Sequence, residues 1–318
     1  MKPRRFWNAF FALFLAAIAM PAAAQDDDRF AFTQDYEPAP ALWSLSDEDT
    51  TIYMLGTIHL LPEGFRWRNP QLDAIIDEVD ELVVETSDAE NARAMERIEP
   101  KLAKLVERRA TTSSQLSPQA RPRWRQLVRM SGIPFETADN MPVLIALLGL
   151  AQPGIEGDPS SYEYGVETVL ELEFAESGRP IGSIEDSGHV MYGLSRVNDV
   201  EVIEELDSRL QEWDGKSGAL YESEYAGKRG DAYWAMEHSW AQGEVADDFD
   251  FNFGGGKIGE AFSHVLLDHR NTRWAEWLDK RLDEPGSILL AVGAGHFEGP
   301  HSLLLKLQDR GLEAERIN

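Results

Sequence analysis

Two apolar runs of strand length, far apart in the chain, end in the same arrangement of glycine and histidine. The first covers residues 51–58, and His59 follows Gly56 by three positions. The second covers residues 288–292 and leads through the same Gly-x-x-His spacing to His296. Short apolar runs rich in β-branched residues are typical of buried strands. The pattern therefore predicts two buried strands, each carrying a histidine just past its end.

Strand and helix patterns alternate in the segments between these runs. Apolar residues at helical spacing over 72–79 lead into a short apolar run at 82–86, which contains Glu85 near its end. A similar short run over 180–185 ends in Glu185. A strand, a helix and a second strand in this order form a βαβ unit, whose strands pair in parallel. We expect an α/β protein with a mixed sheet and flanking helices.

Further helical patterns dominate the middle of the chain. They cover residues 89–109, 118–130, 141–150, 165–175, 198–242, 258–282 and 301–310. No sharp shift in composition marks a domain boundary. The sequence therefore predicts a single domain over residues 41–318, with a helical insertion at about 187–257 and an extended lead-in at 25–40.

The first 24 residues have the features of an export signal. A basic start is followed by an apolar run from Phe6 to Met20 and by small residues up to Ala24. The run is too short for a comfortable membrane span, and no second one follows. We expect cleavage after Ala24, a periplasmic or secreted mature protein, and no stable membrane anchor after cleavage.

Composition removes several classes of function. The chain has no cysteine, which excludes disulfides, thiolate metal sites and cysteine nucleophiles. It has 30 Lys and Arg against 56 Asp and Glu, a net charge of −26. Such a charge repels phosphate backbones, so we expect no nucleic-acid partner. A solvated acidic surface is the simplest interpretation of the excess.

Side chains suited to metal binding follow several of the predicted strands. In α/β sheets, ligands bind beyond the carboxyl ends of the strands, where His59, His296 and Glu85 are expected. Two imidazoles and a carboxylate suit zinc, manganese or cobalt with positions open for water. A metal-free pair of histidine and glutamate acting as acid and base is the alternative.

Other polar residues are candidates for the surroundings of this site. Arg270 and Asn271 lie on the helix before the second histidine strand, where they could stabilise an oxyanion or orient a substrate. Glu185 ends a strand as Glu85 does, and His301 follows His296 by five residues. We expect Glu185 and His301 to orient the residues that bind the metal.

Several of these motifs together resemble the TraB/PrgY/GumN family, which includes the TIKI-type metalloproteases. The resemblance rests on these stretches: Leu42-Trp43, Tyr53-Met54-Leu55-Gly56-Thr57-Ile58-His59, Val83-Val84-Glu85, Gly165-Val166-Glu167, Gly178-Arg179-Pro180-Ile181 leading to Glu185, Arg270-Asn271 and Val292-Gly293-Ala294-Gly295-His296. It implies a fold related to erythromycin esterase and to the haem-binding ChaN-like proteins. It also implies divalent-metal-dependent hydrolysis centred on the two histidines and Glu85, with Arg270 and Asn271 as partners.

This chain departs from the family pattern at two places. Relatives more often have Asp at the position of Glu167, which weakens a role for that residue. After Glu185 they usually continue through Thr, whereas here the chain continues as residues 186–189, Asp-Ser-Gly-His. That departure leaves the role of Glu185 open.

The combined expectation is a periplasmic, divalent-metal-dependent hydrolase, a peptidase acting on a peptide or another small substrate. Two other classes of function need much the same residues. One is a non-catalytic protein that binds haem or another small ligand through the histidines. The other is an accessory factor for polysaccharide biosynthesis, with the acidic helical region as its docking surface.

Overall fold

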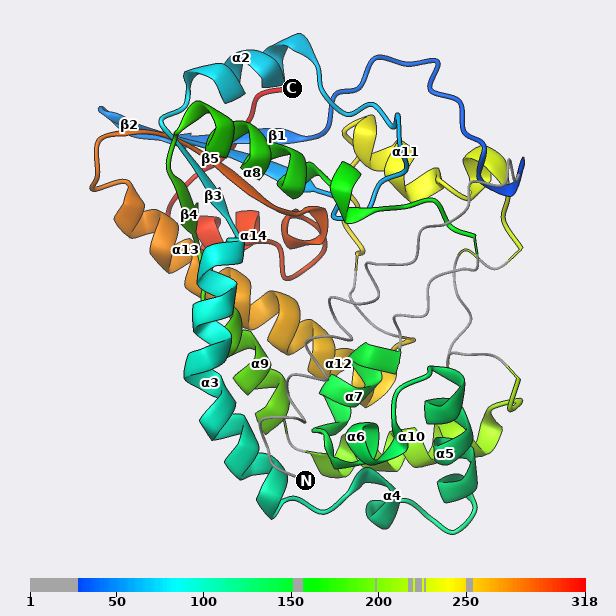
Figure 1. The fold of residues 1–318 in the computed structure, drawn as a ribbon. Helices are drawn as coiled ribbons and strands as arrows, with labels where there is room; N and C mark the ends of the chain where they lie inside the picture. Colours follow the sequence, from blue (N-terminus) through cyan, green and yellow to red (C-terminus); the bar gives the residue numbers. More distant parts are fainter. Residues whose placement is uncertain are drawn as a thin grey trace.

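The computed structural model describes residues 28–150, 157–197, 199–216, 220, 225, 227–249 and 254–318. The predicted export signal and the first residues of the lead-in lie outside this part. A six-stranded sheet with the order β4-β3-β5-β2-β1-β6 forms the centre of the fold (Figure 1). Its strands are β1 Leu42–Ser46, β2 Thr50–Thr57, β3 Glu81–Val84, β4 Ile181–Ser183, β5 Gly286–Gly293 and β6 Glu315–Arg316.

The four strands β4, β3, β5 and β2 run in parallel, and β1 and β6 complete a mixed sheet. β5 pairs in parallel with both β2 and β3, and β3 pairs in parallel with β4. β1 forms an antiparallel hairpin with β2. The carboxyl ends of the four parallel strands therefore meet at one edge of the sheet. The predicted α/β class and mixed sheet are confirmed.

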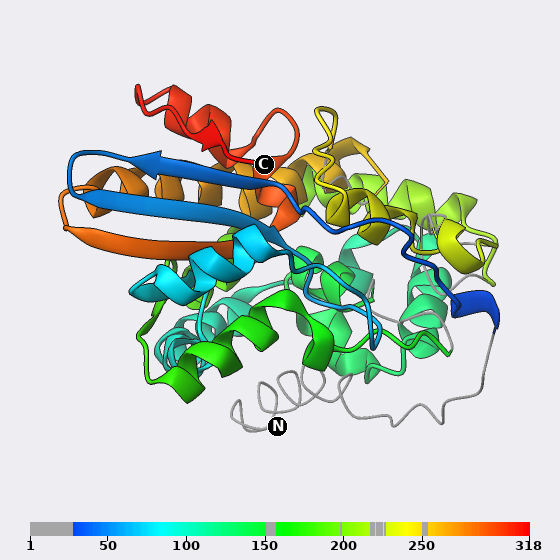
Figure 2. The same ribbon diagram turned by 90° about the horizontal axis from the view of Figure 1, so that it is seen from above.

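Helices cover both faces of the sheet because successive side chains of each strand point to opposite sides. On β5, Leu289 and Ala291 pack with the helices α2 (Pro70–Glu78) and α8 (Val166–Ser177). The alternate residues of β5 pack on the other face with α13 (His269–Arg281) and α14 (Leu303–Gln308). The view from above separates these two layers (Figure 2).

A helical layer lies beyond one end of the sheet (Figure 1). It contains α3 Asp88–Arg108, α4 Thr112–Gln115, α5 Ala120–Met130, α6 Phe135–Asn140, α7 Val143–Leu150, α9 Ser187–Arg196, α10 Asp199–Glu212 and α12 Gly256–Ser263. Apart from α4, these helices share one hydrophobic core, in which Trp124, Leu206 and Phe262 are fully buried. The segment expected as an insertion thus packs together with the helices of residues 88–150.

The helix predicted over residues 198–242 is interrupted. α10 ends at Glu212, and helix resumes at α11 (Ala235–Ala241) after a short 3-10 turn. Gly215 has φ +76°, a conformation that an L-residue in a helix does not adopt. The helical pattern in the sequence therefore continues past Glu212, although helix α10 ends there.

The helix predicted over residues 258–282 is present and contains a feature that the pattern does not reveal. α12 continues into α13 through a π-helical turn, His264–Asp268. Ile258 of α12 packs in the helical layer, whereas Leu278 of α13 packs on the sheet. One continuous helix thus serves two cores. Within the described residues, no helix is long and apolar enough to cross a membrane.

Candidate active site

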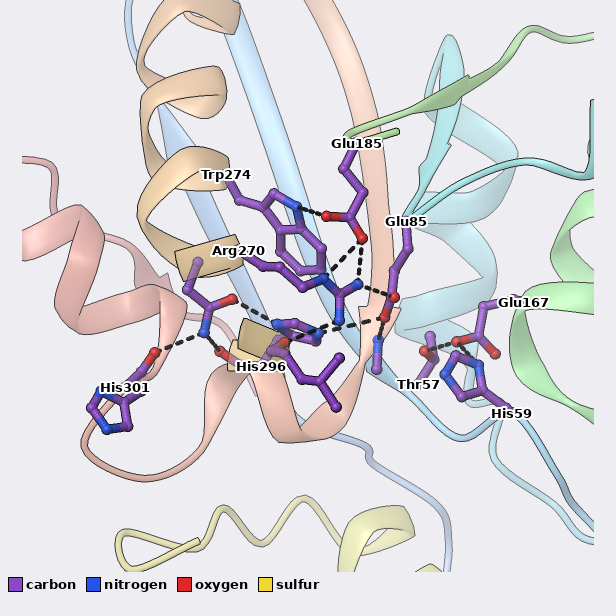
Figure 3. A network of polar contacts seen from close by, with 12 residues as sticks. Thr57, His59, Glu85, Glu167, Glu185, Arg270, Trp274, His296 and His301 are labelled. Carbon is purple, nitrogen blue, oxygen red and sulfur yellow. Dashed lines mark hydrogen bonds and ion pairs between the residues drawn. The ribbon is translucent and has the colours of Figure 1, made fainter. Parts of the chain in front are cut away.

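The carboxyl edge of the parallel strands brings together residues from distant parts of the chain (Figure 3). His59 follows β2, His296 follows the neighbouring strand β5, and Glu85 follows β3 on the other side of β5. A Cβ atom added to Gly293 would lie 3.2 Å from Glu85 Oε1, 3.7 Å from His59 Nε2 and 3.8 Å from His296 Cδ2. The three side chains therefore surround one point beside the end of β5.

His296 is buried, with 4 % of its surface exposed, and its ring orientation is fixed. Trp274 packs against the imidazole with ring centroids 4.1 Å apart. Asn271 donates from Nδ2 to the carbonyl oxygens of His296 and His301, at 3.1 and 2.7 Å. Its amide oxygen therefore faces His296 Nδ1, at 2.6 Å, and accepts a hydrogen bond from the N–H at that atom.

This hydrogen bond decides which ring nitrogen of His296 carries the proton. Burial and the nearby charge of Arg270 lower the pKa of His296 to about 3, so the ring is neutral near pH 7. A neutral ring with its proton on Nδ1 has a lone pair on Nε2. That atom lies 3.7 Å from Glu85 Oε1. His296 is thus poised to act as a ligand or as a base through Nε2.

His59 is held by a residue whose role the sequence did not predict. His59 Nδ1 lies 2.8 Å from Glu167 Oε1, and the hydroxyl of Thr57 donates to the same oxygen. Partial desolvation lowers the pKa of His59, but the charge of Glu167 outweighs it and raises the pKa to about 9. The side chain of His59 nevertheless remains 55 % exposed. The ring is therefore accessible and charged in the absence of a bound cation.

Glu85 is held in its ionised form at the centre of the network. Burial alone would raise the pKa of Glu85, but the guanidinium of Arg270 holds it well below its usual range. Arg270 Nη2 donates to Glu85 Oε2, and the backbone N–H of Gly293 donates to Oε1 at 3.0 Å. The oxygen nearest His296 is thus an acceptor-only carboxylate oxygen.

Arg270 and Asn271 are engaged almost entirely by protein partners. Arg270 donates from Nε and Nη2 to Glu185 Oε1, at 2.9 and 2.5 Å, and from Nη1 to the carbonyl of Leu266 at 3.0 Å. Trp274 Nε1 donates to Glu185 Oε2 at 3.2 Å. The side chain of Glu185 is 5 % exposed, and burial raises its pKa despite Arg270. Glu185 therefore anchors Arg270, which in turn holds Glu85.

His301 contributes its backbone to the network. Its carbonyl accepts from Asn271, whereas its ring pairs with Asp268 at 3.3 Å. Figure 3 places the imidazole of His301 on the opposite side of the network from His59. His301 thus supports Asn271 and, through it, the orientation of His296.

The sequence did not single out Thr57 or Trp274, and it discounted Glu167. One signal for Glu167 was present, because Gly165-Val166-Glu167 opens a helix with an acid in its first turn. Trp274 lies four residues after Arg270 on α13, where one helix turn places both on the same face. Neither the position of Glu167 at the start of its helix nor the spacing of Trp274 from Arg270 indicated a contact with the two histidines.

The kinds of donor present at this edge of the sheet, imidazole nitrogen and carboxylate oxygen, are ones that divalent metals bind. Two ligands on a tetrahedral zinc are about 3.4 Å apart, which follows from metal–ligand distances of about 2.1 Å. His296 Nε2 and Glu85 Oε1, at 3.7 Å, are close to that separation. In the part of the chain that the structure describes, no group of three or more His, Asp or Glu side chains is arranged so that it could hold a metal ion. The fit therefore rests on donor chemistry and on the acceptors that hold both Nδ1 atoms.

The chain was compared with known proteins and with models of protein families. Neither the curated proteins nor the solved structures contain a match to it. A model of the TraB/PrgY/gumN family matches residues 41–316, which include every strand of the sheet and every residue of the network described above. The chain therefore belongs to the TraB/PrgY/gumN family.

Proposed function

We propose that this protein is a divalent-metal-dependent hydrolase, and specifically a peptidase, with its site at the carboxyl edge of the sheet. One observation carries the proposal. His59 Nε2, His296 and Glu85 Oε1 surround the same point, and each Nδ1 atom is bound to an acceptor. Acceptors at the remote ring nitrogen are the usual support of histidines that bind metals.

In this proposal His59, His296 and Glu85 would hold zinc, manganese or cobalt. The ion would polarise a substrate carbonyl and lower the pKa of a water molecule. Arg270 keeps Glu85 ionised and in place, and Asn271 keeps the Nε2 lone pair of His296 available. Because their donors are engaged by protein partners, Arg270 and Asn271 act as positioning residues in this scheme. The oxyanion role expected from the sequence has less support.

The substrate and location complete the proposal. A peptide is the substrate class, which follows from the chemistry implied by the family resemblance. Export into the periplasm or out of the cell is proposed on the basic and apolar pattern of residues 1–24. That segment lies outside the described residues, so sequencing the N-terminus of the mature protein is the direct check of cleavage after Ala24.

Metal binding and peptide cleavage test this function separately. The purified mature protein is titrated with manganese, cobalt and zinc by calorimetry, and each loaded form is incubated with a peptide library read by mass spectrometry. We expect one metal ion per chain and cleavage that His59→Ala, His296→Ala and Glu85→Gln each abolish. His189→Ala, on α9, serves as the matched control. Metal binding without cleavage of any peptide would contradict the peptidase. A haem Soret band that depends on His59 would favour the ligand-binding alternative.

A further inference from the structure

The start of α8 lies against the end of β2, next to the side chain of His59. We infer that Glu167 is the positioning residue of His59, and that Gly165 is the residue that lets α8 reach it. The inference rests on the proposed function in one respect, since it takes His59 as a metal ligand. It assigns a role to a position at which this chain differs from the common family pattern.

The contacts of Glu167 are directed at the ring of His59. Oε1 lies 2.8 Å from His59 Nδ1 and also accepts the hydroxyl of Thr57. Oε2 is buried and has no hydrogen-bond partner in the described structure. All hydrogen bonding of this carboxylate is therefore concentrated on the oxygen that faces His59. With Nδ1 bound there, Nε2 is the nitrogen that faces Glu85.

The backbone fixes this carboxylate against the end of β2. The N–H of Val166 donates to the carbonyl of Ile58 at 3.0 Å. A Cβ atom at Gly165 would overlap the carbonyl oxygen of His59, so any other residue would push the helix away. Glu167 lies in the first turn of α8, where the helix dipole stabilises an ionised carboxylate. Helix start, strand end and carboxylate thus form one unit.

His59 needs this support more than His296 does. His296 is buried, and Trp274 packs against its ring. The side chain of His59 is 55 % exposed, and in the described chain no aromatic ring packs against it. Packing therefore helps to restrain His296, whereas in the described chain the contact with Glu167 is the polar contact that holds the exposed ring of His59. Each histidine is thus bound at Nδ1 by a different group, His296 by the amide of Asn271 and His59 by the carboxylate of Glu167.

The test compares three variants of the full mature protein. Glu167→Ala removes the acceptor, and Glu167→Gln keeps an acceptor oxygen without the charge. Glu163→Gln makes the same charge change at an exposed position four residues earlier. Calorimetry with zinc alone gives the affinity. Long-range ¹H–¹⁵N NMR of the metal-free protein at pH 10, where the ring of His59 is neutral, shows which nitrogen carries the proton.

We expect Glu167→Ala to lower the zinc affinity by about 10- to 100-fold, as losses of such supports usually do. We also expect its ring proton to leave Nδ1. Glu167→Gln should keep the proton on Nδ1 and retain most of the affinity, and Glu163→Gln should match the wild type. Wild-type tautomer and wild-type affinity in Glu167→Ala would overturn the inference. If the wild type binds none of zinc, manganese and cobalt, the proposed function fails, and the tautomer alone decides the role of Glu167.

Discussion

The pair of carboxylates around Arg270 allows a quantitative test of the network. Replacing Arg270 by Met keeps much of the volume of the side chain and removes its charge. Arg270 is 8 % exposed, and it binds Glu185, itself buried, and Glu85. Removing one partner of a buried ion pair costs about 3–5 kcal/mol, since the charges that remain are uncompensated. With a total stability of about 5–15 kcal/mol, the variant should still fold.

The loss should depend on pH, and its sign follows from the two carboxylates. Burial already raises the pKa of Glu185, and without the guanidinium this pKa rises further. When the pKa of a carboxyl group is higher in the folded than in the unfolded state, the folded protein loses stability as the pH rises above the unfolded-state pKa, about 4.3. Arg270 also holds the pKa of Glu85 low, and this stabilisation of the wild type is lost only as the pH falls towards that lowered pKa, so the difference between pH 8 and pH 4.5 comes mainly from Glu185. We therefore expect Arg270→Met to lose about 3–5 kcal/mol at pH 8 and clearly less at pH 4.5.

Urea denaturation at both pH values measures this difference. Arg273 is the matched control, because its side chain is 35 % exposed and lies 3.6 Å from Glu185. Arg273→Met should cost under about 1 kcal/mol, because its contact with Glu185 is longer and the side chain of Arg273 is partly solvated. Adding Glu185→Gln to Arg270→Met should recover part of the loss at pH 8. The reasoning is refuted if Arg270→Met loses the same free energy at both pH values, or no more than Arg273→Met.

Three further predictions address the site. Gly293→Ala should cost little stability, because the φ of −47° at this position is one that alanine adopts. It should lower the metal affinity at least about tenfold, because the methyl group would lie among His59, His296 and Glu85. An unchanged affinity in calorimetry would contradict the convergence of these three side chains. The pKa of His296 is lowered to about 3 in the folded protein, so as the pH falls below about 6.5 this histidine binds a proton in the unfolded chain before it does so in the folded one. In urea denaturation the difference in free energy of unfolding between the wild type and His296→Gln should therefore become smaller towards acid pH. A difference that grows towards acid pH would disprove the assignment of His296 as a buried neutral histidine. Zinc at 100 times its Kd should stabilise the wild type by about 2.7 kcal/mol and His59→Ala far less, and equal shifts of Tm in both would exclude His59 as a ligand.

The residues of the central site could be predicted because each belongs to a local pattern. His59, His296 and Glu85 each follow an apolar run, and parallel strands bring such positions to one edge. The order of the strands could not be read from the runs. Pairing of β5 with both β2 and β3 depends on packing across more than 200 residues of chain, so convergence remained an expectation until the sheet was known.

The supports of the site were harder to predict, because each depends on where two elements dock. Glu167 contacts His59 across 108 positions only because α8 begins against the end of β2. Asn271 was predicted as a site residue, but the spacing did not reveal that its amide holds His296. Trp274 reads in the sequence as an ordinary apolar position of a helix, which it also is. Periodicity identifies the buried face of a helix but not the polar group that the face will meet.

The π-helical turn His264–Asp268 has a consequence for how this helix could change over evolution. A π turn is an α-helix with one additional residue, so deletion of one codon would make the whole helix regular. The part before the turn would then rotate by about 100° relative to the part after it, since an α-helix has 3.6 residues per turn. Either Ile258 would leave the helical layer, or Arg270 would leave Glu85. Substitutions should therefore be tolerated in this turn far more readily than a change in its length.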